Sequence, residues 1–589
     1  ARRRMNLPVP VALNRLAADL RVLSLGIGLA ARGISNNHRT LPSLKPIISS
    51  PFMLNDVAAN VVLTPPFGWL KHRVVVPLAL VSAIACSCRA QEATLEPAPP
   101  AVVTHRSVPL PPKANAAPLW VALDDHLGRG TTAQRSGPLL TLNSAGEQSL
   151  RLSDRSGTEV AEARSLRLSW RLAPLAAPVE IARQIAGPFA SFESAERIAR
   201  SWRDQGVVAR VAHPGDWEVW APIDAEPLDG VSVRTWLRTL KTEIKIVLEA
   251  PSGGRTLQGP LMLEAPNGLL WQGGVLRGPF RLQPDAYGSW TLLEQVPLER
   301  YLEGVVPHEI GAGSPAAALE AQAVLARTWA LANSHRFAID GYHLCSDTQC
   351  QVYSDPRQAS AVVRQAIAAT SGQVLAWKGE PIQAWYHASN GGVMAGGEEA
   401  WAMDSLPYVQ ARADGSAAWI KGMALPLQDA SSVRGLLARG DAAYGTNHPR
   451  FRWSRTYSAA QVAQALRAAG LSAGVPSALR VQKRGASGRV LALDIEMTAD
   501  GEAVMLRLDG IRRTLRRLPS TLFVIETLGP DRWRFNGGGF GHGVGLSQAG
   551  AIDLAARGWS FERILSHYYP GTTLTTVQAP SSSDPAQAP

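Results

Sequence analysis

The hydrophobic and polar positions divide the chain into stretches of different period. Short apolar runs split by Gly and Ser fill residues 119–171, and strand-like runs with Gly-rich turns recur between Val231 and Gln295. Short apolar runs bounded by turn residues are typical of β-strands, and residues 119–171 show no long helical period. We therefore expect a β-rich region over residues 119–230, with further strands after it.

Residues 187–222 follow a different pattern, which predicts a strand, a helix and a closing hairpin. Apolar residues recur at helical spacing in 194–205, Gly206 ends the helix, and Pro214-Gly215 marks a turn between two strands. With its Gly-Pro-Phe start and its QG break, the segment resembles the SPOR repeat, a module that binds peptidoglycan strands stripped of their stem peptides. The alternative is a small α+β element of the main domain.

The stretch from Val296 to Ala332 combines a strand-like approach, a loop with Pro and Gly, and a helix. Ser314 is the expected N-cap of this helix and Pro315 its first residue. Glu309 is therefore expected in the loop just before the helix. A carboxylate at that place also has a purely structural interpretation, since it complements the helix dipole.

Three further segments are rich in residue types that carry chemistry. They are CSDTQCQVYSD at 345–355, AWYHASNGGVMAGGEEAW at 384–401, and the glycine-rich stretch that begins FNGGGFGHGVGLSQAG at 535–574. Together with YLEGVVPHEI and AQAVLARTWA, this ordered set resembles the SpoIID/LytB family of bacterial envelope proteins. The resemblance covers Val296 to Leu574 and implies a SpoIID-like catalytic domain over 231–577, so the expected fold class is α+β.

The resemblance implies a lytic transglycosylase that acts on peptide-free peptidoglycan, with Glu309 as its catalytic acid. Cleavage of a β-1,4 glycosidic bond needs a proton on the leaving oxygen, which a carboxylic acid still protonated near neutral pH supplies. In a lytic enzyme the sugar's own 6-hydroxyl closes on the anomeric carbon, so one acid suffices and a 1,6-anhydro end remains. If a second carboxylate takes part, the candidates are Glu303, Glu320 and Asp347.

Two opposite influences on the pKa of Glu309 follow from its neighbours. Burial among Val305, Val306 and Ile310 raises the pKa, and a helix N-terminus lowers it. The sequence does not decide which influence is larger.

The resemblance also places four residues along the glycan cleft beside the acid: His542, Ser547, Gln548 and Ser389. The glycine loop over 537–545 differs from a dinucleotide-binding turn and from a P-loop in its spacing and in the lack of a following Lys. Ser547 only approaches a serine elbow, because Ala549 stands where that motif has Gly. A serine hydrolase using Ser547 and His542 remains as a further alternative.

Relatives in the SpoIID family hold zinc near the cysteine segment with two Cys and two His. The matching residues are Cys345, Cys350 and His343, and His387 completes a structural zinc site if the fold brings it close. Gln349 stands where the family often has His. A Cys345–Cys350 disulfide in an oxidising compartment explains the same pair, and free thiols are the third interpretation.

Composition and charge limit the remaining classes of function. A chain of 589 residues is too long for one compact core, which stops growing at about 250–300 residues. The net charge of +11 is concentrated in residues 1–90, which hold eleven Lys and Arg against two acids, so the body is nearly neutral. We therefore expect no nucleic-acid partner.

The amino-terminal 90 residues are interpreted as a leader with a secretory signal at 71–90. Basic residues precede the apolar run Val74–Ala85, and Ala83-Ile84-Ala85 has the small residues of a cleavage site. Cys86 directly after it raises the alternative of a lipoprotein. A Pro-rich linker over 91–118 and a disordered tail over 578–589 complete the plan.

The expected location is extracytoplasmic, in the periplasm or the cell envelope, and the expected partner is the peptidoglycan glycan strand. Retention of Glu309 favours the enzyme. The alternative, suggested by the LytB side of the family, is a non-enzymatic peptidoglycan-binding protein that enhances a cell-wall amidase.

Overall fold

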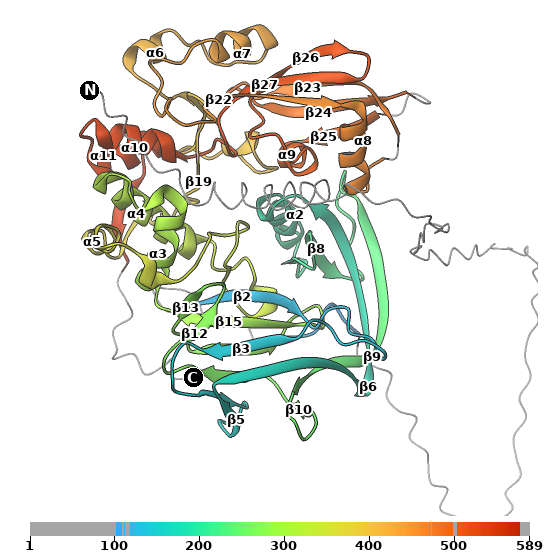
Figure 1. The fold of residues 1–589 in the computed structure, drawn as a ribbon. Helices are drawn as coiled ribbons and strands as arrows, with labels where there is room; N and C mark the ends of the chain where they lie inside the picture. The colour runs from blue at the N-terminus through green and yellow to red at the C-terminus, as the bar shows by residue number, and fades with distance from the viewer. Residues whose placement is uncertain (1–101, 109–110, 112–117, 473, 499–502, 578–589) are drawn as a thin grey trace, which may run out of the picture. The chain divides into compact units, whose positions relative to one another are not determined.

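The structure is a computed structural model that describes residues 102–108, 111, 118–472, 474–498 and 503–577 (Figure 1). The leader with its signal, Cys86, most of the Pro-rich linker and the tail lie outside the described residues, so those interpretations stay predictions. Both helices and strands are abundant, which confirms the α+β class. None of the helices in this part of the chain is long and apolar enough to cross a membrane.

Two large sheets form from the strands up to residue 345. In the first, the order is β10-β9-β6-β3-β12-β13, with β1 and β8 also paired to β6 and β7 paired to β8. Its strands are β1 (Val102–Val103), β3 (Leu140–Ser144), β6 (Ser165–Phe189), β7 (Arg210–Ala212), β8 (Trp217–Pro222), β9 (Val233–Leu248), β10 (Arg255–Leu257), β12 (Leu269–Trp271) and β13 (Gly274–Leu276).

The second sheet has the order β16-β2-β15-β14-β11-β4-β5. Its strands are β2 (Leu119–Leu127), β4 (Leu150–Ser153), β5 (Glu159–Ala163), β11 (Leu261–Glu264), β14 (Phe280–Pro284), β15 (Trp290–Val296) and β16 (Leu344–Cys345). Through β16, the cysteine segment is attached to the edge of this sheet, because Cys345 pairs with Ala122.

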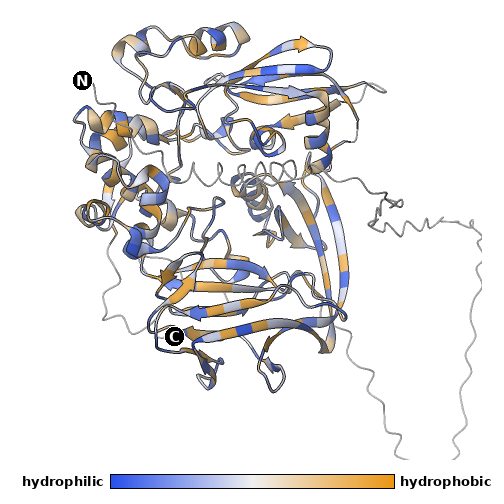
Figure 2. Cartoon of the chain, viewed as in Figure 1, coloured by the Kyte–Doolittle hydropathy of each residue, from blue (hydrophilic) through white to orange (hydrophobic). Residues whose placement is uncertain are grey.

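The predicted domain boundary between residues 230 and 231 is wrong. The long strands β6 and β9 lie on either side of it and pair antiparallel from Ala186↔Val233 to Leu168↔Leu248. Hydrophobic and hydrophilic residues alternate along both strands, as expected for a sheet with two different faces (Figure 2). The residues between β8 and β9 thus connect two strands of one sheet and do not link two domains.

The SPOR-like segment has the predicted order of elements. Helix α2 spans Phe192–Asp204 and is capped by Ser191, and Gly206 after it has a φ of +82°. Trp202 and Trp217 from this segment are buried in a cluster that also contains Cys345 from the cysteine segment. The segment is therefore packed onto the main body, and its SPOR identity stays a prediction.

The chain after β15 is helical where we expected a strand-like approach and a loop. Helix α3 spans Leu298–Val306, and a π-helical turn, η1, follows at Pro307–Gly311. Leu298, Tyr301, Leu302 and Val305 recur at helical spacing, which explains the helix. Ser314 is not an N-cap, because its hydroxyl donates to the Ile310 carbonyl at 2.8 Å, and Pro315 takes the cap position.

Helix α4 (Ala316–Ala332) is the centre of the helical part. It packs against α3, α5 (Ala361–Ala369), α10 (Gln548–Ala556) and α11 (Phe561–Tyr568). One hydrophobic core joins these helices to the strands that begin at Leu119. The β-rich region therefore packs against helices α3 and α4, and Glu309 lies in the turn between these two helices.

The residues from 373 onward add small sheets and helices. Short strands pair as β18-β17-β29, β19-β28 and β20-β21, and two three-stranded sheets pair as β22-β27-β26 and β23-β24-β25. The bounds are β17 (Gln373–Trp377), β18 (Glu380–Pro381), β19 (Tyr386–His387), β20 (Val393–Met394), β21 (Arg412–Ala413), β22 (Arg452–Ser458), β23 (Pro476–Arg484), β24 (Val490–Met497), β25 (Ala503–Arg507), β26 (Phe523–Gly529), β27 (Arg532–Gly538), β28 (Leu546–Ser547) and β29 (Thr573–Thr576).

Four further α-helices of the described residues belong to this part: α6 (Ala417–Lys421), α7 (Ala430–Leu437), α8 (Ala459–Ala468) and α9 (Asp509–Thr514). Short 3₁₀ turns occur at η2 (Ala338–Asp340), η3 (Pro356–Gln358) and η4 (Gly397–Glu399). The glycine loop lies between β27 and α10, as predicted.

A glycine in α3 tests how closely this helix packs on the chain after the cysteine segment. A Cβ at Gly304 would lie 2.5 Å from the Ser354 carbonyl oxygen and 2.6 Å from the Tyr353 ring. We expect Gly304→Ala to lower the free energy of unfolding by about 1–3 kcal/mol through overpacking. Denaturant unfolding followed by circular dichroism measures the change.

Gly435 in α7 is the matched control, because a Cβ there meets no atom within 4 Å. Gly435→Ala should raise stability by about 0.5–1 kcal/mol through helix propensity. Equal effects of the two substitutions would contradict the packing described for α3.

Candidate active site

Strand pairing brings the 384–401 segment beside the glycine loop. β19 runs parallel to β28, with Tyr386 opposite Leu546 and His387 opposite Ser547. Bridges between Ser389 and Phe540 and between Ala395 and Val544 continue the contact. Helix α10 begins directly after β28, so its first residue, Gln548, lies next to this pair of strands.

Glu309 lies in the π-helical turn η1 and is partly exposed. Its Oε1 accepts a hydrogen bond from the Val352 N–H at 3.2 Å. The Tyr386 hydroxyl and the Gln548 amide also hydrogen-bond to the carboxyl group. The predicted acid is therefore surrounded by three donors, which come from the cysteine segment, β19 and α10.

The pKa of Glu309 is governed by its burial. Burial raises the pKa to about 7, although the three hydrogen bonds act in the opposite direction. Among the described residues, no charged side chain is an influence on this pKa. The effect of burial is therefore the larger one, and a substantial share of the carboxyl groups keeps its proton at neutral pH.

The three candidates for a second carboxylate have other surroundings. Glu303 lies 3.5 Å from Arg300 in a salt bridge, and Asp347 accepts from the Gln349 N–H at 2.8 Å. Burial, followed by the charge of Glu562, raises the pKa of Glu320. None of the three is among the influences on the pKa of Glu309.

His542 is held by the backbone on both ring nitrogens. Its Nδ1 accepts from the Val544 N–H at 3.1 Å, so Nε2 carries the hydrogen and donates to the Tyr386 carbonyl at 3.0 Å. Burial first, and then the charge of Arg512, lowers the pKa of His542 to about 3. The ring is therefore neutral and attaches the glycine loop to β19.

The two predicted serines are structural in this arrangement. Ser547 is the N-cap of α10, and its hydroxyl accepts from the Gly550 N–H at 3.3 Å. Ser389 and Ser547 are 2% and 1% exposed. The expectation that they face a cleft is wrong, because the fold uses them inside the framework. The serine-hydrolase alternative also fails, because both nitrogens of His542 are bonded to the backbone.

The cysteine segment contains a disulfide between Cys345 and Cys350. His343 Nδ1 accepts from the Trp120 N–H at 2.8 Å, and His387 lies against His542 with its Nδ1 3.1 Å from the Val544 carbonyl. Within the described ranges, no three or more His, Cys, Asp or Glu residues are grouped so that they could hold a metal ion. The four predicted ligands therefore do not fit a zinc site, because zinc needs free thiolates and the sulfurs are bonded to each other.

Several residues at the acid were missed at the level of sequence. Tyr386 and Gln351 lie inside two of the quoted motifs, yet neither was singled out, and the Val352 N–H has no sequence signal. Gln322 did have a sequence signal, because it is a polar residue within the apolar run of α4. It is 0% exposed, and its Oε1 accepts from the Gln548 amide at 3.3 Å.

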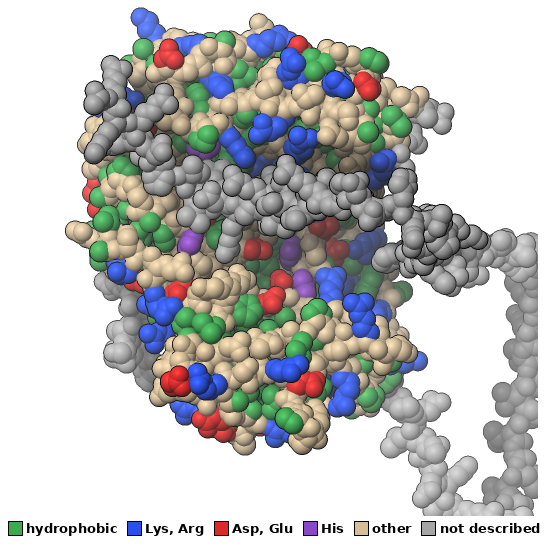
Figure 3. Space-filling view, viewed as in Figure 1, with side chains coloured by type: hydrophobic (Ala, Val, Ile, Leu, Met, Phe, Trp, Pro, Cys, Tyr) green, Lys and Arg blue, Asp and Glu red, His purple; other side chains and the backbone are tan. Residues whose placement is uncertain are grey.

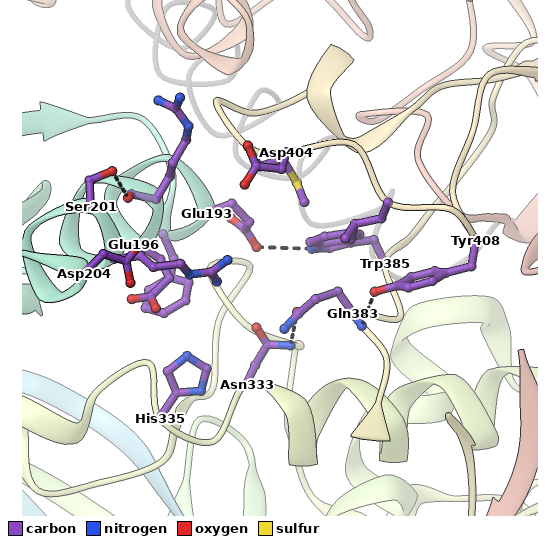
Figure 4. A pocket seen from close by; sticks show the side chains of 15 residues that line it. Glu193, Glu196, Ser201, Asp204, Asn333, His335, Gln383, Trp385, Asp404 and Tyr408 are labelled. Carbon is purple, nitrogen blue, oxygen red and sulfur yellow. Dashed lines mark hydrogen bonds between the residues drawn. The ribbon is translucent and has the colours of Figure 1, made fainter. Parts of the chain in front are cut away.

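A separate pocket of about 340 Å³ lies between α2 and the 383–408 segment (Figure 4). Figure 4 shows the hydrogen bond from the Trp385 indole to Glu193, which measures 3.2 Å. Trp385 and Tyr386 are consecutive, yet one contacts this pocket and the other contacts Glu309. Glu309 does not line this pocket.

On the face shown in Figure 3, acidic and histidine side chains gather in a hollow near the centre. The pocket beside α2 has a mixed lining, in which charged residues such as Glu196 and Arg197 stand beside apolar ones such as Phe192 and Leu406.

The fold and this geometry define an α+β protein in which the partly buried carboxyl group of Glu309 is held by three hydrogen-bond donors and lies near a glycine loop. Residues 286–377, which include Glu309, match the family model described as Stage II sporulation protein, SpoIID. Residues 395–545 match a domain of unknown function, DUF8618.

Three relatives are similar to about half of the chain. Stage II sporulation protein D of Bacillus amyloliquefaciens is 29% identical over 49% of this chain and 76% of its own length. The Stage II sporulation protein D of Bacillus subtilis (strain 168) is 28% identical over 49% of this chain and 77% of its own length. The amidase enhancer of Bacillus subtilis (strain 168) is 27% identical over 47% of this chain but only 40% of its own length. Residues 286–377 therefore carry a SpoIID domain, and the chain is similar to members of the SpoIID/LytB family over about half of its length.

The disulfide can be checked directly. Peptide mapping without reductant should recover the peptides of Cys345 and Cys350 linked to each other, and metal analysis should find less than one zinc per chain. Recovery of both cysteines as free thiols, together with about one bound zinc per chain, would contradict the site described here.

Proposed function

We propose that the chain is a peptidoglycan lytic transglycosylase that cleaves β-1,4 glycosidic bonds of peptide-free glycan strands, with Glu309 as the general acid. The single observation that supports this function best is the state of that carboxyl group. It is buried enough to have a pKa of about 7, and it is still partly exposed. An acid that acts near neutral pH needs this combination.

The proposed reaction uses Glu309 twice. Its proton moves to the glycosidic oxygen as the bond from this oxygen to the anomeric carbon breaks. The Val352, Tyr386 and Gln548 donors stabilise the carboxylate left behind. The sugar's 6-hydroxyl then bonds to the anomeric carbon and returns its proton to Glu309, which restores the acid and leaves a 1,6-anhydro end.

The surroundings of Glu309 favour this route over hydrolysis by a carboxylate pair. Glycosidases with two carboxylates hold them about 5–9 Å apart. Among the described residues, no charged group influences the pKa of Glu309. A ring-closing reaction needs no second carboxylate to activate water, so one acid with neutral donors is sufficient.

The proposed location is extracytoplasmic. The Cys345–Cys350 disulfide is of the kind that persists in oxidising compartments, and the relatives named above are a sporulation protein and an amidase enhancer. Export by the signal at 71–90, with lipidation at Cys86 as the alternative, stays part of this proposal.

The name of the third relative supports a second candidate function, which is enhancement of a cell-wall amidase without catalysis. In that case the protein binds glycan, and Glu309 contributes nothing beyond binding. A cell-wall amidase is the partner that this alternative requires.

The two candidate functions predict different effects of the Glu309→Gln substitution on glycan cleavage. We expect wild-type protein to release 1,6-anhydro products from purified peptide-free glycan strands, and the variant to be about 10²–10⁴-fold slower because it has no proton to give. Mass spectrometry identifies the anhydro products, which are lighter by one water than hydrolysis products.

Glu303→Gln is the matched control, since Glu303 is a neighbouring acid paired with Arg300. It should keep near wild-type activity. Glycan binding without anhydro products from either the wild type or Glu309→Gln would support the amidase enhancer and overturn the enzyme.

The pH dependence of cleavage has a definite sign. The group must be protonated to act, and burial raises its pKa to about 7. The rate should therefore fall as the pH rises through about 7, with a tenfold loss for each further unit. A rate that falls through pH 4–5, where an ordinary Glu titrates, would contradict the assignment.

A further inference from the structure

The segment that follows the disulfide reaches the acid through two consecutive residues. Val352 donates its N–H to Glu309, and Gln351 donates its Nε2–H to the Tyr386 hydroxyl oxygen at 2.8 Å. Gln351 is 1% exposed, so this bond is protected from water. Neither residue is an acid, a base or a nucleophile, so the proposed chemistry does not account for Gln351.

The hydrogen bonds through the Gln351 side chain form a series in which each group donates to the next. The Tyr301 hydroxyl donates to Gln351 Oε1 at 3.2 Å, and the amide in turn donates to Tyr386. Because the Tyr386 oxygen accepts from Gln351, its single hydrogen is left for Glu309. Successive donors of this kind polarise one another, which strengthens the last bond.

The same segment is fixed at its start. The disulfide joins Cys350, one residue before Gln351, to Cys345, which pairs with β2 in the large sheet. The Cys345 N–H also donates to the Cys350 sulfur at 3.0 Å. The disulfide therefore connects the backbone of Gln351 and Val352 to the strands of the second large sheet.

We infer that Gln351 is a positioning residue for the acid: it directs the Tyr386 hydroxyl toward Glu309, and the Cys345–Cys350 disulfide holds it in place to do so. The inference rests on the proposed function for its catalytic meaning. In physical terms, the hydrogen-bond network stabilises the carboxylate form of Glu309, so that a buried acid can still release its proton.

The titratable groups that face Glu309 are compatible with this assignment. They are Tyr386 from β19 and Tyr301 from α3, and burial raises the pKa of both well above the ordinary value for tyrosine. Both therefore keep their hydrogens and remain donors. His308, in the same turn, hydrogen-bonds to the Ser354 hydroxyl.

The test measures the titration of Glu309 itself, without substrate. Protein labelled with ¹³C at the glutamate carboxyl is titrated by NMR, and the Glu309 resonance is identified by its loss in Glu309→Gln. Tyr386→Phe should raise the pKa by about one unit, because it removes a donor to the carboxylate. Gln351→Leu should raise it in the same direction by about half a unit.

The double variant shows whether Gln351 acts through Tyr386. If it does, adding Gln351→Leu to Tyr386→Phe should produce little further change, so the two shifts are not additive. Full additivity overturns the network. Gln349→Leu is the control in the same loop, since this exposed side chain accepts from Trp217 at 3.4 Å and should leave the pKa unchanged.

Reduction tests the disulfide in the wild-type chain, so no variant has to fold. Treatment with a phosphine reductant should shift the Glu309 titration in the same direction as Gln351→Leu and slow anhydro-product release, while a chelator should change neither. An unchanged titration after complete reduction overturns the role of the disulfide. Absence of anhydro products alone would reject the proposed enzyme and leave the titration result standing.

Discussion

The carboxyl group of Glu309 is largely buried, no charged side chain of the described residues influences its pKa, and the surrounding arrangement depends on how that burial is balanced. Burial alone would hold the proton too tightly for an acid that must release it. Donors from Val352, Tyr386 and Gln548 act against this effect, and the balance leaves a pKa of about 7. Glu309 and its three donors come from four segments that lie far apart in sequence. The fold must therefore bring these four segments together.

The large sheets and the buried helix α4 provide the rigid base for that meeting. One core joins the amino-terminal strands to α3, α4 and α10, so the turn that carries Glu309 and the start of α10 are fixed to the same body. The pairing of β19 with β28 adds Tyr386, and the neutral ring of His542 attaches the glycine loop to that strand. The disulfide between Cys345 and Cys350 fixes the remaining segment.

The sequence predicted the α+β class, the order of elements in residues 187–222 and the place of the glycine loop between a strand and a helix, because each of these depends on local patterns or on motifs. It did not predict that residues 119–296 form interleaved sheets, since the pairing of β6 with β9 depends on contacts between distant positions. Glu309 was expected in a loop because the Pro and Gly near it signal turns, whereas tertiary packing continues the helix through them. Ser389 and Ser547 were assigned to the cleft from the family resemblance, and only the fold shows that their hydroxyls are used internally.

The central claim is that Glu309 delivers its proton to a glycosidic oxygen, and the most direct measurement is a crystal structure of Glu309→Gln with a bound peptide-free glycan oligosaccharide. The account predicts a glycosidic oxygen within hydrogen-bond reach of the residue 309 side chain, at about 2.6–3.2 Å, with the 6-hydroxyl of the adjoining sugar facing its anomeric carbon. An oligosaccharide bound elsewhere, with residue 309 in contact only with protein, would contradict it.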